Sequence, residues 1–145
     1  MTIALVVGSF DPLIQGQADL IRRVAEIAEH VIVAVEATPA HKPLYTLEER
    51  ISRVQEAVAA QSTVEVRAYD GDLARLVEET GATAYVVALR SAGDVERVLA
   101  EIQPACNALG LEIISLLAEP KYGFVTTALV RDVVRMGGDS RPFVP

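Results

Sequence analysis

The segment Ile3-Ala4-Leu5-Val6-Val7-Gly8-Ser9-Phe10-Asp11-Pro12, followed by apolar residues at helical spacing, decides the fold of this chain. Its five consecutive apolar residues predict a buried strand, and the Gly-Ser-Phe-Asp-Pro segment predicts a tight turn. The next residues indicate a helix that ends near His30, which would then lie at the favourable carboxyl end of the helix dipole. Strand, loop and helix form the first half of a βαβ unit. Anions commonly bind where such a loop meets the helix, so we expect a phosphate-bearing ligand there.

Strands and helices are expected to alternate along the rest of the chain. Further strands are predicted at residues 31–35, 64–68, 84–88 and 112–117. Helices are predicted at 46–60, at 73–80, from 91 to about 109 with a kink or early end at Pro104, and from 126 or 127 to about 136. This alternation predicts an α/β fold, with residues 1–145 forming a single domain around a doubly wound, five-stranded, mostly parallel sheet. The loops after the strands should lie along one edge of that sheet.

The composition fits this fold and argues against several classes of function. Hydrophobic residues make up 51% of the 145 residues and aromatic residues only 5%, which suits the aliphatic core of a buried parallel sheet. The net charge of −7 argues against a nucleic-acid partner. The sequence has no signal peptide and no membrane-spanning stretch of about 18 apolar residues, so we expect a cytoplasmic protein without a membrane partner.

Cys106 is the one cysteine, so it cannot form an intramolecular disulfide. We interpret Cys106 as a small buried hydrophobic residue in preference to a nucleophile. The sequence shows no spacing of cysteines or histidines that is typical of a metal site, and we therefore expect no protein-held metal.

Four segments carry a resemblance to a known family, although the common phosphate-binding signatures Gly-x-x-x-x-Gly-Lys and Gly-x-Gly-x-x-Gly are absent. The segments are Gly8-Ser9-Phe10-Asp11-Pro12, residues 42–50 (KPLYTLEER), Leu89-Arg90, and residues 124–131 (FVTTALVR) with Gly137-Gly138-Asp139. Over essentially the whole chain, they resemble the phosphopantetheine adenylyltransferases of the nucleotidyltransferase superfamily. The resemblance implies a Rossmann-like nucleotidyltransferase fold.

The resemblance also implies a reaction. The family joins ATP to 4′-phosphopantetheine, producing dephospho-coenzyme A and pyrophosphate, usually with Mg²⁺ and in a homohexamer. It therefore implies ATP as a substrate, a phosphopantetheine-type ligand, Mg²⁺ in an active enzyme, and a homo-oligomer such as a hexamer. The substrate phosphate attacks the α-phosphorus of ATP directly, so the side chains that matter are cations and hydrogen-bond donors.

The positions that match the family's motifs imply roles for individual residues. The implied catalytic residues are Gln17, His41 and Arg90. The implied nucleotide-binding residues are Ser9, Phe10, Arg90, Thr126 and Thr127, and the implied substrate-binding residues are Ser9, His41 and Leu73.

All of these residues except Leu73 also have a purely structural interpretation. These alternatives are a turn hydroxyl for Ser9, a core aromatic ring for Phe10, a helix-start residue for Gln17, a solvated loop residue for His41, a salt bridge with Asp94 or Glu96 for Arg90, and helix caps for Thr126 and Thr127.

Several of the implied positions depart from the family's pattern. Gln17 stands where the family has a histidine, and its amide can donate only a neutral hydrogen bond. His41 aligns with the catalytic lysine and is only partly cationic near neutral pH, although Lys42 could replace it after a loop shift. Val87 and Val98 replace an arginine and a glutamate.

Two hypotheses follow from this pattern. The chain is a phosphopantetheine adenylyltransferase with weakened or altered activity, or it is a non-catalytic relative. The non-catalytic relative would bind a nucleotide or a coenzyme A-type ligand, or would serve as an assembly subunit.

Overall fold

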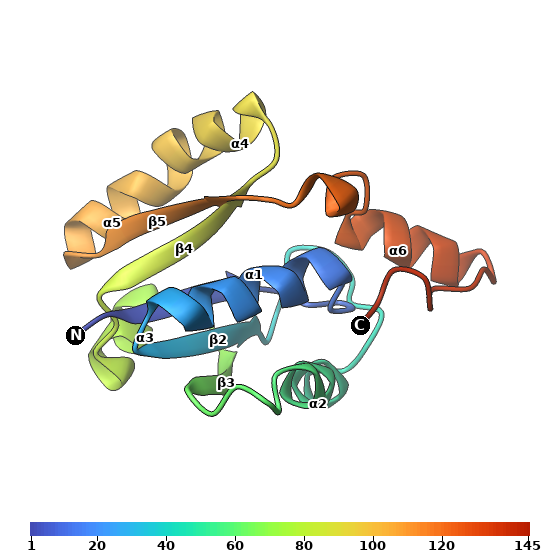
Figure 1. Cartoon of the computed structure of the whole chain (residues 1–145), viewed down its shortest axis with the longest axis horizontal. Coiled ribbons are helices and arrows are strands. Elements are labelled where there is room, and N and C mark those ends of the chain that lie inside the picture. Colours follow the sequence, from blue (N-terminus) through green and yellow to red (C-terminus); the bar gives the residue numbers. More distant parts are fainter.

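Five parallel strands form one sheet in the computed structural model, which describes residues 1–145 (Figure 1). The strands are β1 (Ile3–Gly8), β2 (His30–Glu36), β3 (Val64–Tyr69), β4 (Ala84–Leu89) and β5 (Glu112–Leu117). Their spatial order is β3-β2-β1-β4-β5, and all four neighbouring pairs are parallel. β2 and β3 therefore lie on one side of β1, and β4 and β5 lie on the other side. This arrangement confirms the predicted doubly wound α/β fold.

Helices connect the strands as the apolar periodicity predicts. The α-helices are α1 (Gln15–Ile27), α2 (Leu47–Ala57), α3 (Leu73–Thr80), α4 (Ala92–Arg97), α5 (Gln103–Leu109) and α6 (Thr127–Arg135). A π-helical turn, η1 (Val98–Ile102), joins α4 to α5, and a 3₁₀ turn, η2 (Pro120–Tyr122), precedes α6. No helix has the length and apolar character needed to cross a membrane.

The sheet is covered by helices on both faces, and each face has its own core. Side chains of α1 and α2 pack on one face against aliphatic residues of β1 and β2, including Val6 and Val33. Side chains of α3 and α5 pack on the other face around Leu5 and Cys106. Cys106 has no exposed surface, and burial raises the pKa of its thiol, which disfavours the reactive thiolate. The interpretation of Cys106 as a buried hydrophobic residue is confirmed.

One local prediction is wrong, and a second is correct only in part. His30 does not end a helix, because α1 stops at Ile27 and His30 already begins β2, where its N–H donates to the Thr2 carbonyl at 3.3 Å. Pro104 does not end the helical run, which continues to Leu109. The run is nevertheless interrupted next to Pro104, which lies in the first turn of α5, directly after the π-helical turn.

A buried guanidinium joins three segments at the carboxyl edge of the sheet. Arg50 in α2 is 1% exposed, and its nitrogens donate to the carbonyls of Tyr45 at 3.2 Å, Ser9 at 2.9 Å and Glu36 at 2.7 Å. Ser9 follows β1, and Glu36 is the last residue of β2. One side chain therefore satisfies backbone acceptors from the loops after two neighbouring strands and from the start of α2.

A buried carboxylate joins the same loops from the other side. Asp11 has no exposed surface, and its oxygens accept the N–H groups of Leu44 at 2.7 Å and Tyr45 at 2.9 Å. His41 Nε2 lies 3.1 Å from the same carboxylate. The loop after β1 and the loop after β2 are thus held together by hydrogen bonds to buried charged groups.

Arg50→Lys should lower the free energy of unfolding by about 2–4 kcal/mol, because one ammonium cannot reach three carbonyls that are shielded from water. Urea unfolding followed by circular dichroism would measure the loss. Arg141→Lys is the matched control, since the Arg141 side chain is 88% exposed, and it should change stability by less than about 0.5 kcal/mol. Equal stability of the two variants would contradict the bridging role of Arg50.

Tyr85 on β4 should make stability fall at alkaline pH. Burial, followed by repulsion from Tyr69, raises the pKa of the Tyr85 phenol from 10.0 to about 12. The fold therefore favours the neutral phenol, so this contribution is complete below pH 10 and is lost as the pH rises through 12. In the unmodified chain, Tyr85 should lower the free energy of unfolding by about 2 kcal/mol between about pH 9 and about pH 11.5. Tyr85→Phe should abolish this decrease, as measured by urea unfolding at the two pH values.

The matched control for this measurement is Tyr45→Phe, because the Tyr45 ring lies under the Arg53 guanidinium and away from β4. This variant should retain the alkaline loss that Tyr85 causes. An alkaline loss in Tyr85→Phe as large as in the unmodified chain would show that the phenol of Tyr85 is not responsible.

Candidate functional site

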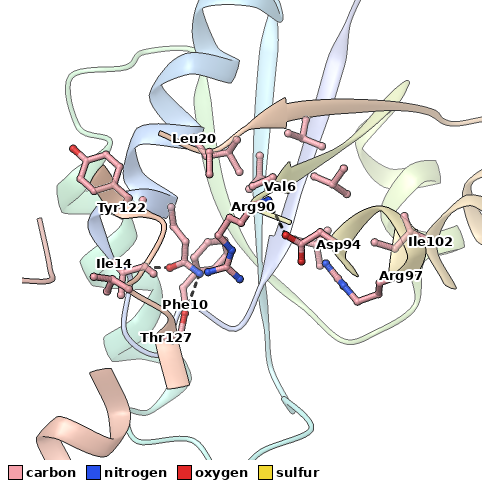
Figure 2. Close-up of a pocket in the computed structure, with 18 of the residues that line it drawn as sticks. Val6, Phe10, Ile14, Leu20, Arg90, Asp94, Arg97, Ile102, Tyr122 and Thr127 are labelled. Carbon is pink, nitrogen blue, oxygen red and sulfur yellow. Dashed lines mark hydrogen bonds between the residues drawn. The ribbon is translucent and has the colours of Figure 1, made fainter. Parts of the chain in front are cut away.

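The largest concentration of predicted site residues lies in a pocket of about 250 Å³ at the carboxyl ends of β1 and β4. The strands supply its apolar floor, and the amino ends of α1 and α6 and the helix α4 supply its walls (Figure 2). Ligands of doubly wound sheets bind at this position, where the chain reverses its direction of winding between two adjacent strands. The pocket brings together four predicted residues, namely Phe10, Gln17, Arg90 and Thr127.

Phe10 lies in both the core and the pocket. Its φ of +48° is in the left-handed region, which turns the chain sharply after β1. The ring folds back over Gly8, where a Cβ would lie 3.3 Å from the Phe10 Cζ. Phe10 is only 2% exposed, so its interpretation as a core aromatic is confirmed, while a ligand contact by its pocket face stays a prediction.

The Gln17 side chain already has two hydrogen-bond partners within the protein. Its Oε1 accepts the N–H of Ile14 at 3.1 Å, and its Nε2 donates to Thr127 Oγ1 at 3.3 Å. Gln17 is therefore both a helix-start residue and a link between α1 and α6. The second N–H of its amide is the donor that remains for a ligand.

Arg90 follows β4 and extends into the pocket on the side of Phe10 and Thr127 (Figure 2). The predicted alternative of a salt bridge with Asp94 or Glu96 is wrong. Asp94 instead accepts the backbone N–H of Arg90 at 2.7 Å and that of Ser91 at 3.2 Å, since it caps the start of α4. The Arg90 guanidinium, without an ion pair, can bind an anion.

The remaining predicted site residues do not line this pocket. Ser9 presents its carbonyl to Arg50, and the His41 ring is held by the buried Asp11. Thr126 Oγ1 accepts the Leu129 N–H at 3.1 Å, which confirms Thr126 as the cap of α6. Leu73 begins α3 and packs on the opposite face of the sheet.

His41 differs from the solvated loop residue of the structural interpretation, since its ring bonds the buried Asp11. Ligand contacts by Ser9, His41, Leu73 and Thr126 stay predictions.

Sequence reasoning missed four polar residues that line the pocket, one of which is Tyr85 on β4. Asp94 and Arg97 lie on α4, and Tyr122 lies on the 3₁₀ turn before α6. The helix start at residue 91 was predicted, but the sequence does not show which face of that helix lines the pocket. Tyr122 packs against Gly16, where a Cβ would lie 3.2 Å from the Tyr122 Cβ, so a larger residue at this position would push Tyr122 away by a few tenths of an ångström.

One face of α6 holds the loops that surround the pocket. Its polar residues at positions i, i+4 and i+8 are Thr127, Arg131 and Arg135, which therefore share that face. Thr127 accepts the Gln17 amide, Arg131 donates to the Asp11 carbonyl at 3.3 Å, and Arg135 donates to the Lys42 carbonyl at 3.0 Å. The three contacts are made to three different segments around the pocket.

The chain does not fit a protein-held metal ion, because no group of three or more His, Cys, Asp or Glu side chains could coordinate one. The polar groups of the pocket that can contact a ligand include arginine, amide and hydroxyl groups.

Comparisons with known proteins agree on one family. A family model described as cytidylyltransferase-like matches residues 5–133. The chain is 35% identical over 147 residues to the phosphopantetheine adenylyltransferase of Caldanaerobacter subterraneus subsp. tengcongensis, with 100% of this chain and 91% of that protein covered. It is 36% identical over 149 residues to the phosphopantetheine adenylyltransferase of Heliobacterium modesticaldum, with coverages of 100% and 87%.

A solved structure shows the same fold at low sequence identity. It is that of a bifunctional NMN adenylyltransferase/ADP ribose pyrophosphatase from Francisella tularensis in complex with AMP and a manganese ion. The match has a TM-score of 0.72 and 13% identity, and it covers 99% of this chain and 44% of that one. The chain belongs to the cytidylyltransferase-like family and is a relative of the phosphopantetheine adenylyltransferases.

Proposed function

We propose that this chain transfers the adenylyl group of ATP to 4′-phosphopantetheine and that its activity is weakened. The observation that carries the proposal is the full-length similarity of about 35% to phosphopantetheine adenylyltransferases. The pocket supports it, because Phe10, Gln17, Arg90 and Thr127 line one cavity at the strand ends. Following the family resemblance, we also propose a cytoplasmic homo-oligomer.

The proposed reaction is a direct displacement at phosphorus. A phosphate oxygen of 4′-phosphopantetheine forms a bond to the α-phosphorus of ATP, while the bond from that phosphorus to the bridging oxygen of the β-phosphate breaks. Dephospho-coenzyme A and pyrophosphate are the products. The protein has to hold two polyanions together and offset the negative charge between them, so it needs no covalent nucleophile.

Arg90 provides the main electrostatic contribution in this mechanism. Its unpaired guanidinium can donate two parallel hydrogen bonds to phosphate oxygens. The remaining N–H of Gln17 and the Thr127 hydroxyl supply weaker, neutral contacts. The helix amino ends of α1 and α6 face the same pocket and favour negative charge there.

Two substitutions explain why the activity should be weak. Gln17 is neutral and is already bonded to Ile14 and Thr127, so it replaces a charged donor poorly. His41 is bonded to the buried Asp11 and does not line the pocket. These two features also favour the second candidate function, a relative that binds the nucleotide without catalysing transfer.

Arg90→Met should lower kcat/KM by about a hundredfold, because the charged contact to the transferring phosphates is lost. The measurement is pyrophosphate release from Mg-ATP and 4′-phosphopantetheine. Arg75→Met on α3 is the matched control, since Arg75 is exposed and pairs with Asp70 away from the pocket, and its rate should stay within about twofold of that of the unmodified chain. A rate unchanged by Arg90→Met would contradict the assigned role.

The double substitution Gln17→His and His41→Lys should raise the rate of pyrophosphate release by about tenfold or more. Gln17→His introduces a donor that can carry positive charge, and His41→Lys replaces a partly cationic ring with a fully charged ammonium on a longer side chain. Charge-assisted hydrogen bonds are about twice as strong as neutral ones. Measurable turnover by the unmodified chain supports the weakened enzyme. No turnover by that chain, together with turnover by the double variant, would favour the binding protein.

A control with the same change in composition is Gln55→His with His30→Lys. Gln55 is exposed on α2. His30 is exposed at the start of β2, at the end of the sheet opposite to the pocket. This control should leave the rate unchanged. An equal increase in both double variants would show that general charge, and not the position of the new donors, raises the rate.

A further inference from the structure

Arg97 is a second cation at the pocket to which the proposed mechanism gives no role. It is the last residue of α4 and lines the pocket together with Arg90. Neither guanidinium takes part in an ion pair, although the chain carries a net charge of −7. The family resemblance assigns no function to this position.

The local helix geometry directs Arg97 toward the pocket. Asp94 and Arg97 are three residues apart and therefore share one face of α4. The π-helical turn that begins at Val98 rotates through a smaller angle per residue than an α-helix, so Ile102 lies on the same side as Arg97. The side chains of Asp94, Arg97 and Ile102 all line the pocket. Figure 2 shows Arg97 reaching toward the pocket from α4, whereas Arg90 enters from the end of β4.

The neighbouring polar groups leave the charge of Arg97 available. Asp94 accepts the backbone N–H groups of Arg90 and Ser91, and it forms no ion pair with Arg97. Tyr85 lies at the same pocket, and with a pKa of about 12 its phenol is neutral at neutral pH. The charged groups that line the pocket are therefore two arginines and one aspartate, and this combination favours an anionic ligand.

We propose that Arg97 is a specificity-determining residue that binds a phosphate group of the ligand on the α4 side of the pocket. Arg90 and Arg97 then contact two different parts of a phosphorylated ligand. The phosphate belongs either to the polyphosphate chain of ATP or to 4′-phosphopantetheine, and the shared chemistry is a phosphate group with anionic oxygens. The identity of these two ligands rests on the proposed function.

The test compares phosphorylated ligands with phosphate-free ones by isothermal titration calorimetry on the full chain. The ligands are ATP, AMP, adenosine, 4′-phosphopantetheine and pantetheine. Arg97→Met should weaken the binding of ATP or of 4′-phosphopantetheine by about tenfold or more and leave adenosine and pantetheine within about twofold. Arg97→Lys should recover part of the lost affinity, and Arg75→Met should change none of the affinities.

The ligand that responds identifies the source of the phosphate. A loss for ATP and not for AMP assigns Arg97 to the β- or γ-phosphate, whereas a loss confined to 4′-phosphopantetheine assigns it to the acceptor. Affinity that falls equally for phosphorylated and phosphate-free ligands would show a structural role and overturn the proposal. Unchanged affinity for both phosphorylated ligands, or no binding of any of the five by the unmodified chain, would overturn it as well.

Pyrophosphate release separates this proposal from the proposed function. Turnover by the unmodified chain, with Arg97→Met binding both substrates normally, would retain the function and reject the role of Arg97. Phosphate binding that depends on Arg97, without turnover by the unmodified chain, would retain the role of Arg97 and reject the enzyme.

Discussion

The hydrogen bonds of two buried charged groups, Arg50 and Asp11, determine where the loops of this site lie. Arg50 satisfies carbonyls from the loop after β1, the end of β2 and the start of α2, and Asp11 satisfies N–H groups of the loop after β2. Separating these loops would leave a buried charge or several buried backbone groups without partners, which costs several kcal/mol. The carboxyl edge of the sheet is therefore rigid around β1 and β2, while the pocket opens between β1 and β4.

The same arrangement changes which side chains can act on a ligand. The ring of His41, a predicted site residue, is bound to the carboxylate of Asp11. Gln17 lies in the pocket and uses its amide to connect α1 with α6. Positive charge at the pocket consequently comes from the β4–α4 side, where Arg90 and Arg97 lie.

The fold could be predicted because its signals are local. The aliphatic run 31–35 indicated a buried strand, and the Thr46-x-x-Glu49 spacing indicated a helix start, where the structure shows both reciprocal hydrogen bonds at 3.2 Å. The site was harder to predict, because its lining depends on how distant segments approach one another. The left-handed backbone of Phe10 has no local sequence signal, and Pro104 signals an irregular helix without fixing the π-helical turn at Val98, yet both features decide which neighbours reach the pocket. Motif matching could place Arg90 at the site but could not reveal Arg97.

The polar face of α6 restricts where residues can be inserted into or deleted from this chain. Thr127, Arg131 and Arg135 hold three separate segments only while their spacing keeps them in line along the helix. Inserting or deleting one residue between the first and the last of them would rotate Arg135 by about 100° and turn it away from Lys42. Indels within α6 would thus uncouple the second loop from the helix, whereas the exposed turn around Gly71, outside this polar face, can vary in length without disturbing the segments around the pocket.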